Sequence, residues 1–199
     1  MAANKEILDF DPDLLRNKYR EERDKRLRSD GNDQYQEVEG DFTYFVDDPY
    51  VDEKIERNSI TDEIEVAIIG GGFGGILAAA RLKEAGIEDF KIFEKGGDFG
   101  GTWYWNRYPG ASCDIESYIY FPLLEQTKFI PKQKYTNAPE TLEYIGVIAE
   151  KYGLKERAVF QTEITDVTWS DEKKLWNIST NKGDSINAKF VVHSNGPLN

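Results

Sequence analysis

The chain has 199 residues, of which 39% are hydrophobic, and it carries a formal net charge of -12. This length predicts one domain, or one domain with a tail, and the negative charge argues against nucleic acid and anionic membranes as partners. The single cysteine, Cys113, and the single histidine, His193, exclude an intramolecular disulfide, a CxxC metal site and a multi-histidine metal centre, so no metal is expected.

The charge is concentrated near the N-terminus. The first 63 residues hold 19 acidic and 10 basic side chains, and so nine of the twelve net negative charges. The start of the chain lacks the apolar core of a signal peptide, and no apolar run approaches the roughly 20 residues of a membrane span. We therefore expect a cytoplasmic protein with no membrane span.

Residues 1–63 are expected to form an N-terminal extension. Asp11 followed by Pro12 is typical of a helix start, and Gly31 is typical of a position just past a helix end, which predicts a helix over about 12–29 and then irregular chain. The helix has a thin apolar stripe. It is either a solvated, partly frayed helix or an arm that packs on another chain or domain.

The ordered part is expected at 64–199. The apolar run 66–69 is typical of a strand buried on both faces of a parallel sheet. A glycine turn, a helix beginning at Ile76 and ended by Gly86, and a second strand at 90–94 follow. Strand, turn, helix and strand within about 30 residues are the pattern of a nucleotide-binding βαβ unit.

The later elements continue this domain. The pattern predicts a helix at 139–152, a short strand at 159–160, an antiparallel meander at 164–169, 175–179 and 185–188, and a last strand at 190–193. The predicted fold class is α/β: a Rossmann-like βαβ sheet with a small antiparallel β-meander, plus the helical or irregular extension.

Gly70, Gly72 and Gly75 form G-x-G-x-x-G between the first strand and its helix. The first glycine allows a tight turn, the second lets the backbone approach a pyrophosphate, and the third lets helix and strand pack closely. Glu94 ends the second strand and can accept hydrogen bonds from both ribose hydroxyls, which disfavours a 2′-phosphate and therefore NADP at this site. The alternative is a glycine-rich turn that binds no ligand.

Residues 100–117 read GGTWYWNRYPGASCDIES. Two tryptophans and two tyrosines in a loop broken by glycine and proline suggest a flat, stackable partner such as a flavin. The meander also favours FAD over NAD, because NAD domains usually continue with alternating strands and helices. The three aromatic residues at 103–105 could instead be ordinary core side chains.

These stretches resemble the N-terminal FAD-binding portion of flavin-containing Baeyer–Villiger monooxygenases. The similarity covers about two-thirds of the chain and rests on IIGGGFGG at 68–75, the loop at 100–117, PETLEYIGVIAEKYGL at 139–154 and VVHSNGPL at 191–198. The loop is the most specific of the four. The resemblance implies an enzyme that uses NADPH and O₂ to insert oxygen beside the carbonyl of a small-molecule ketone, giving an ester or lactone.

The resemblance also implies roles for single residues. The pyrophosphate would lie in a cradle of glycines, the adenosine ribose on an acid, and the flavin against aromatic groups. The implied cofactor-binding residues are Gly70, Gly72, Gly74 and Gly75 for the pyrophosphate, Glu94 for the ribose, Gly101, Thr102 and Trp103 along the pyrophosphate and ribityl chain, Trp105 in the wall, Tyr120 and Asp114 near the isoalloxazine, and the backbone of Ile164 near the adenine. Asp114 would serve catalysis by positioning an arginine from later in the family's chain.

The sequence departs from the family at Ser112, where an arginine is usual, and it ends at Asn199. The NADPH domain and the C-terminal FAD segment are expected to be absent, so that the chain alone would be inactive. A C-terminal half or a homo-oligomer partner is possible. The alternative is a shortened paralog without redox activity, an isomerase- or cyclase-like protein that uses Asp114 and Tyr104 as acid–base groups. His193, in an apolar strand, is expected to be a core histidine.

Overall fold

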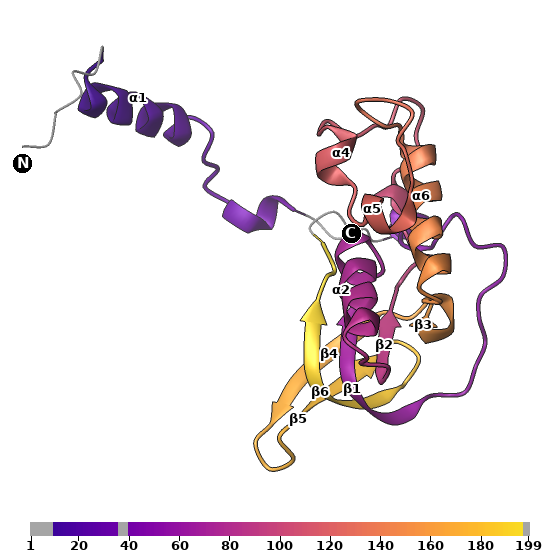
Figure 1. Cartoon of the computed structure of the whole chain (residues 1–199). Helices are drawn as coiled ribbons and strands as arrows, with labels where there is room; N and C mark the ends of the chain where they lie inside the picture. Colours follow the sequence, from indigo (N-terminus) through magenta and orange to yellow (C-terminus); the bar gives the residue numbers. More distant parts are fainter. Residues whose placement is uncertain (1–9, 36–39, 197–199) are drawn as a thin grey trace, which may run out of the picture. The chain divides into compact units, whose positions relative to one another are not determined.

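The computed structural model describes residues 10–35 and 40–196. The chain divides into two compact units, one ending at Asp47 and the other beginning at Asp48 (Figure 1). Residues 1–9 and 36–39 of the predicted extension, and Pro197 and Leu198 of the last matching stretch, lie outside the described residues. Within the described ranges, no helix has the length and apolar character needed to cross a bilayer.

The first unit contains α1 (Pro12–Asp24) and two 3-10 helices, η1 (Gly31–Gln34) and η2 (Gly40–Val46). The side chain of Asp11 caps α1 by accepting hydrogen bonds from the backbone N–H of Asp13 and Leu14, as expected from the sequence. The prediction that this helix reaches about residue 29 is wrong. None of its residues is buried, so no packing supports the last turns, and a helix held by propensity alone is marginal.

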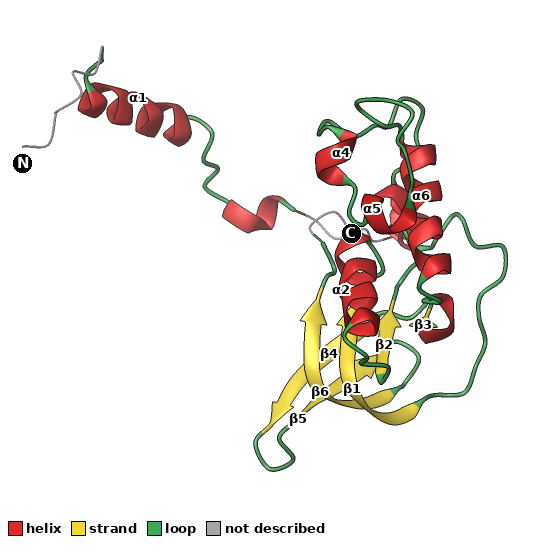
Figure 2. Cartoon of the chain, in the orientation of Figure 1, coloured by secondary structure: helices red, strands yellow, loops and turns green. Residues whose placement is uncertain are grey.

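The second unit is built on one six-stranded sheet in the order β3-β2-β1-β6-β5-β4 (Figure 2). The pairs among β3, β2, β1 and β6 are parallel, and β4, β5 and the first part of β6 form the antiparallel meander. The α/β fold with its meander is confirmed. The strands are β1 (Thr61–Ile69), β2 (Phe90–Phe93), β3 (Ala158–Val159), β4 (Ile164–Ser170), β5 (Leu175–Thr180) and β6 (Ser185–His193).

Two strands are longer than the sequence pattern predicts. β1 begins at Thr61, which pairs with Ser185, rather than near Glu65. β6 is continuous where two strands were expected, since Ala188 and Phe190 both pair with β1. No glycine or proline interrupts the chain between them, so one strand serves both the parallel layer and the meander.

Helices cover one face of this sheet. Helix α2 (Phe73–Glu84) lies against β1, β2 and β6, and it also contacts α6 (Ala138–Lys151). Ile68 and Ile92 point into the core shared with these helices, whereas Ala67 and Phe93 point into a second core against the meander. Successive side chains of β1 and β2 thus alternate between the two cores. Both faces of these strands are buried, which explains their continuous apolar sequence.

The loop region between β2 and α6 contains three one-turn helices that sequence patterns did not predict. They are α3 (Thr102–Trp105), α4 (Ser117–Tyr120) and α5 (Leu124–Thr127), and a 3-10 helix, η3 (Lys155–Arg157), precedes β3. Such short turns carry no helical periodicity, because four residues complete only one turn. α3 packs against α6 and thereby holds the aromatic loop against that helix.

Candidate functional site

A cavity of about 530 Å³ opens where the parallel strands end. Ile69, Phe93 and His193 are adjacent in register at the carboxyl ends of β1, β2 and β6, and all three line the cavity. Ligands of open α/β sheets bind at this edge. The predicted site residues that line it are Gly70, Gly72, Gly74, Glu94, Gly101, Thr102, Trp103, Trp105, Tyr120 and Ile164.

The glycine turn forms one wall of the cavity. Gly70 has φ +99°, and a Cβ there would lie 2.5 Å from the carbonyl oxygen of Ser194. A Cβ at Gly75 would lie 1.9 Å from the carbonyl oxygen of Gly70, so Gly75 supports the turn from behind and is not itself in the cavity lining. Gly72 is the N-cap of α2 and offers no capping side chain. The first N–H groups of a helix have no partner within the helix and favour an anion.

A second glycine turn approaches the first. Gly101 has φ +52°, and a Cβ there would lie 2.9 Å from the Cα of Gly72. The N–H of Gly100 donates a hydrogen bond of 3.0 Å to the carbonyl oxygen of Gly71. The two turns therefore form a backbone surface that carries no side chains, which is what close approach to a pyrophosphate requires.

Glu94 is the acid at the end of β2, and it is only 4% exposed. One carboxylate oxygen accepts a hydrogen bond of 2.6 Å from the N–H of Gly71, and the other accepts one of 2.7 Å from the N–H of Gly96. Burial raises the pKa of Glu94, while these two backbone donors lower it. Each carboxylate oxygen has a second lone pair available to a hydroxyl.

Aromatic side chains line the cavity beyond the second turn. The indole Nε1 of Trp103 donates a hydrogen bond of 3.0 Å to the hydroxyl of Tyr120. The ring of Tyr120 meets that of Phe73 edge-on, with centroids 5.3 Å apart. Burial raises the pKa of Tyr120, the bond from Trp103 lowers it, and the charge of Asp114 contributes a further increase. Trp105 is half-buried and also lines the cavity.

Two of the predicted acid–base residues, Asp114 and Tyr104, also lie outside the cavity lining. Asp114 is exposed in the loop after the aromatic residues and is not among the lining residues. Tyr104 is buried and donates a hydrogen bond of 2.6 Å to Asp48, also away from the cavity lining. Burial and the carboxylate of Asp48 raise the pKa of Tyr104. His193 is exposed, so the expectation of a core histidine is wrong. It is the last residue of β6 and lies at the carboxyl end of that strand.

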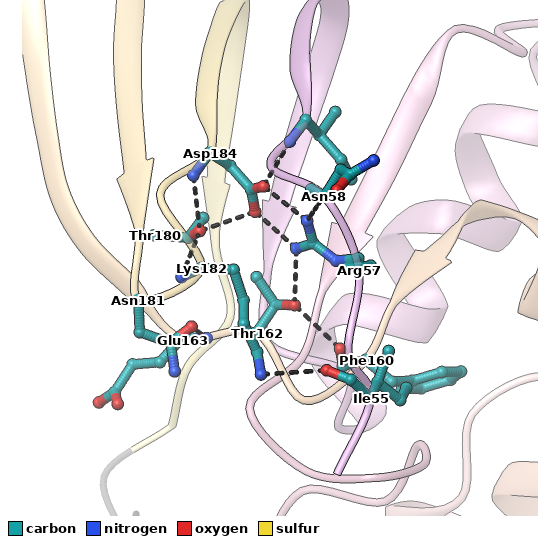
Figure 3. Close-up of polar contacts among 11 residues, drawn as sticks. Ile55, Arg57, Asn58, Phe160, Thr162, Glu163, Thr180, Asn181, Lys182 and Asp184 are labelled. Carbon is teal, nitrogen blue, oxygen red and sulfur yellow. Dashed lines mark hydrogen bonds and ion pairs between the residues drawn. The ribbon is translucent and has the colours of Figure 1, made fainter.

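Residues 48–60, which we call the strap, precede β1 and had been predicted to be part of the extension. Asp48 also accepts a hydrogen bond of 3.0 Å from the N–H of Gly97. At the other end, Arg57 and Asp184 form two hydrogen bonds of 2.6 Å each (Figure 3). The strap is thus hydrogen-bonded to residues far along the sequence, and no local sequence pattern predicts such pairs.

Replacing Asp184 with asparagine is expected to lower the free energy of unfolding by about 2 kcal/mol at pH 7, because a hydrogen-bonded buried charge is lost. The guanidinium of Arg57 holds the pKa of Asp184 well below its usual range. This stability is present above the unfolded pKa of about 3.9 and is lost as pH falls through the folded pKa. Urea unfolding of both chains should therefore show their difference shrinking below about pH 4.

The matched control is Asp171→Asn, which removes one carboxylate of a surface pair whose side chain is 90% exposed. That change should alter stability by less than about 0.5 kcal/mol. Equal stabilities of the wild-type and Asp184→Asn chains at pH 7 would contradict the prediction.

Comparison with known proteins agrees with this geometry. Residues 68–130 match the family described as NAD(P)-binding Rossmann-like domain. "Baeyer-Villiger monooxygenase ATR8" of Stachybotrys chlorohalonatus is 47% identical over 192 residues, which cover 96% of this chain and 31% of that protein. The chain is therefore similar to one part of the Baeyer–Villiger monooxygenases. It spans about a third of the length of the curated relatives that it matches.

Other similar proteins agree with this result. Neopentalenolactone D synthase of Streptomyces avermitilis is 44% identical over 189 residues, covering 94% of this chain and 32% of that protein. The solved structure of polycyclic ketone monooxygenase from Thermothelomyces thermophila superimposes with a TM-score of 0.79 at 35% identity, over 92% of this chain and 32% of that one. The family resemblance expected from the sequence is therefore confirmed.

Several lining residues were missed by sequence reasoning. Lys95 and Glu163 face each other at the cavity with their charged atoms 3.6 Å apart. Thr162 and Ser194 also line it. Lys95 and Ser194 each follow a strand that sequence patterns did predict, so the rule that ligands bind at carboxyl ends would have found these two. Thr162 and Glu163 follow β3, whose two residues gave a weaker signal.

Proposed function

We propose that the cavity binds FAD and that the chain supplies the FAD-binding part of a Baeyer–Villiger-type monooxygenase. The observation that carries the proposal is the contact between the two glycine turns at Gly72 and Gly101, directly beside the buried carboxylate of Glu94. A side chain at Gly101 would meet the backbone of the other turn. The residues present therefore fit a dinucleotide whose pyrophosphate lies against backbone and whose ribose lies against an acid.

The pyrophosphate would lie at the N-terminus of α2, where backbone N–H groups and the helix dipole favour negative charge. Gly70, Gly72 and Gly74 would leave room for it, with Gly101 and Thr102 opposite. The adenosine ribose would bond to Glu94. The backbone of Ile164, at the start of β4 and in the cavity lining, would approach the adenine.

The flavin would lie toward the aromatic side of the cavity. Trp103, Trp105 and Tyr120 line the cavity there, and Trp103 and Tyr120 hold one another in place by a hydrogen bond. A flavin ring is large and planar, so fixed aromatic walls bind it with little loss of side-chain entropy. For Asp114 we propose the role that the resemblance implies, which is to position an arginine near the flavin end of the cavity.

When bound, FAD supplies the redox chemistry, and the protein supplies binding, orientation and electrostatics. The activity proposed for a protein that contains the whole set of sites is NADPH- and O₂-dependent insertion of oxygen beside the carbonyl of a small-molecule ketone. The similarity to a polycyclic ketone monooxygenase supports a ketone substrate. The described residues contribute the cofactor site to that reaction.

The alternative reading, a shortened paralog with acid–base chemistry, depends on Asp114 and Tyr104. Neither side chain lines the cavity, and the hydroxyl of Tyr104 is bonded to Asp48. This arrangement favours the cofactor site over the acid–base site.

The test is titration of the purified chain with FAD, followed by quenching of flavin fluorescence and by the visible absorption spectrum. We expect saturable binding that ADP competes away. ADP bearing a phosphate on its 2′-oxygen should compete at least about tenfold more weakly, because Glu94 would face that phosphate. A chain that binds neither FAD nor ADP would contradict the proposal.

A further inference from the structure

A cluster of polar contacts around Arg57 joins the strap to Asp184 and Thr162 (Figure 3). The side chain of Asp184 is fully buried, and that of Arg57 is 19% exposed. Besides the two bonds from Arg57, the carboxylate of Asp184 accepts bonds of 2.7 Å from the N–H of Ile60 and from the hydroxyl of Thr180. The negative charge is thus fully satisfied within the protein.

The guanidinium of Arg57 reaches one residue further. Its Nη2 donates a hydrogen bond of 3.2 Å to the hydroxyl of Thr162, which is 1% exposed and lines the cavity. The N–H of Thr162 in turn donates a bond of 2.9 Å to the carbonyl oxygen of Glu94. Two hydrogen bonds therefore connect Arg57 to the residue whose carboxylate faces the cavity.

The strap also holds the residue before Thr162. Gln161 has φ +49°, a left-handed conformation that is unfavourable for a residue with a side chain. Its side-chain oxygen accepts a bond of 2.7 Å from the N–H of Ile55, and its amide donates one of 3.2 Å to the carbonyl oxygen of Glu53. A segment with an unfavourable backbone conformation persists only when its surroundings hold it, and here the strap does so.

A buried ion pair is a weak source of net stability, because desolvation of the two charges offsets most of their attraction. The guanidinium group of an arginine, in contrast, fixes the relative positions of its hydrogen-bond acceptors, since its donors lie in one rigid plane. In this cluster the guanidinium group joins Asp184, on the turn before β6, to Thr162, on the segment that leads into β4. We therefore expect the Arg57 side chain to contribute more to the position of Thr162 than to the net stability of the fold.

We propose that Arg57 is a positioning residue for the adenosine end of the cavity: it fixes the wall segment 162–164 against Glu94. This inference rests on the proposed dinucleotide function. Arg57 does not line the cavity, so it acts through Thr162 and not by contact with the ligand.

The experiment uses the full chain with Arg57→Gln and measures dissociation constants for FAD and for ADP. Both are expected to rise about tenfold, the size of effect expected when one orienting hydrogen bond behind the cavity wall is lost. The two factors should be equal, because FAD and ADP share the adenosine and pyrophosphate half. Urea unfolding without ligand is measured in parallel at the same temperature.

Arg157→Gln is the matched control. Arg157 forms an ion pair with Glu88 at 3.2 Å, outside the cavity lining, and its loss should leave both dissociation constants unchanged. Ile178→Val, a change in the second core, should lower stability and also leave both constants unchanged. Arg57→Lys keeps a cation beside Asp184 but lacks the guanidinium group, so we expect it to recover folding stability while ligand affinity stays reduced.

The outcomes separate the two proposals. If the wild-type chain binds FAD and ADP and Arg57→Gln binds both equally well, the positioning role is overturned and the dinucleotide function stands. A loss for FAD alone, with ADP unchanged, also overturns it, because the adenosine end would then be unaffected. If the wild-type chain binds neither ligand, the proposed function fails and this inference fails with it.

Discussion

Replacing Gly75 with alanine is expected to lower the free energy of unfolding by about 3 kcal/mol and to abolish measurable FAD binding. The added Cβ would lie 1.9 Å from the carbonyl oxygen of Gly70 and 3.4 Å from the side chain of Ile68. The obstacle is backbone, which cannot move aside as a flexible side chain can, so helix α2 or the turn must shift. Overpacking of this kind typically costs about 1–3 kcal/mol. Urea unfolding and flavin titration measure the two effects.

The chain offers a matched glycine in another helix. Gly146 is exposed in the middle of α6, and a Cβ there would meet nothing within 4 Å. Gly146→Ala should therefore stabilise the chain by about 0.5–1 kcal/mol, since alanine loses less backbone entropy on folding than glycine does. If both substitutions had the same sign of effect, the close packing inferred at Gly75 would be refuted.

Replacing Glu94 with glutamine is expected to weaken binding of FAD and of ADP about 100-fold. The amide nitrogen of glutamine would face the N–H of either Gly71 or Gly96, so one buried backbone donor would lose its acceptor. The unsatisfied buried donor costs about 1–3 kcal/mol of folding stability, with or without ligand. Affinity falls because the amide leaves one acceptor oxygen for the ribose hydroxyls where the carboxylate has two. About 2.7 kcal/mol corresponds to this loss of affinity. Isothermal titration with ADP gives the constant directly.

The same substitution has a pH signature in the ligand-free chain. Because the folded pKa of Glu94 is raised by burial, its contribution to stability is fully present below the ordinary pKa of about 4.3 and is lost as pH rises through the folded pKa. Stability of the wild-type chain relative to Glu94→Gln should fall over that window and then level off. Glu143→Gln, on the exposed side of α6, is the control and should show no loss of affinity. A flat difference between wild type and Glu94→Gln would count against the buried carboxylate.

The glycine turn and Glu94 could be predicted from the sequence because their rules are local. A strand, a turn with fixed glycine spacing and an acid at the end of the next strand lie within 30 residues, and each has a steric or hydrogen-bonding reason to be there. The cavity contains Gly70, Gly72 and Glu94 as those rules require. Their binding roles remain predictions until ligand titration.

The residues that could not be predicted depend on contacts between distant parts of the chain. Tyr104 was a candidate acid–base group because of its place in the aromatic loop, but its direction is set by Asp48, 56 residues earlier. Arg57 carries no periodic signal, and its partner Asp184 is 127 residues away. Nothing in a short window of sequence specifies such pairs, and only the folded sheet brings them together.

The long sequence separation of Arg57 and Asp184 has a consequence for synthesis on the ribosome. Chains are made at about 5–20 residues per second, so the arginine is exposed for several seconds before its carboxylate partner has been translated. During that interval β1 also lacks β6, its main parallel neighbour. The wall of the cavity is therefore completed late, only when the last strand has been made.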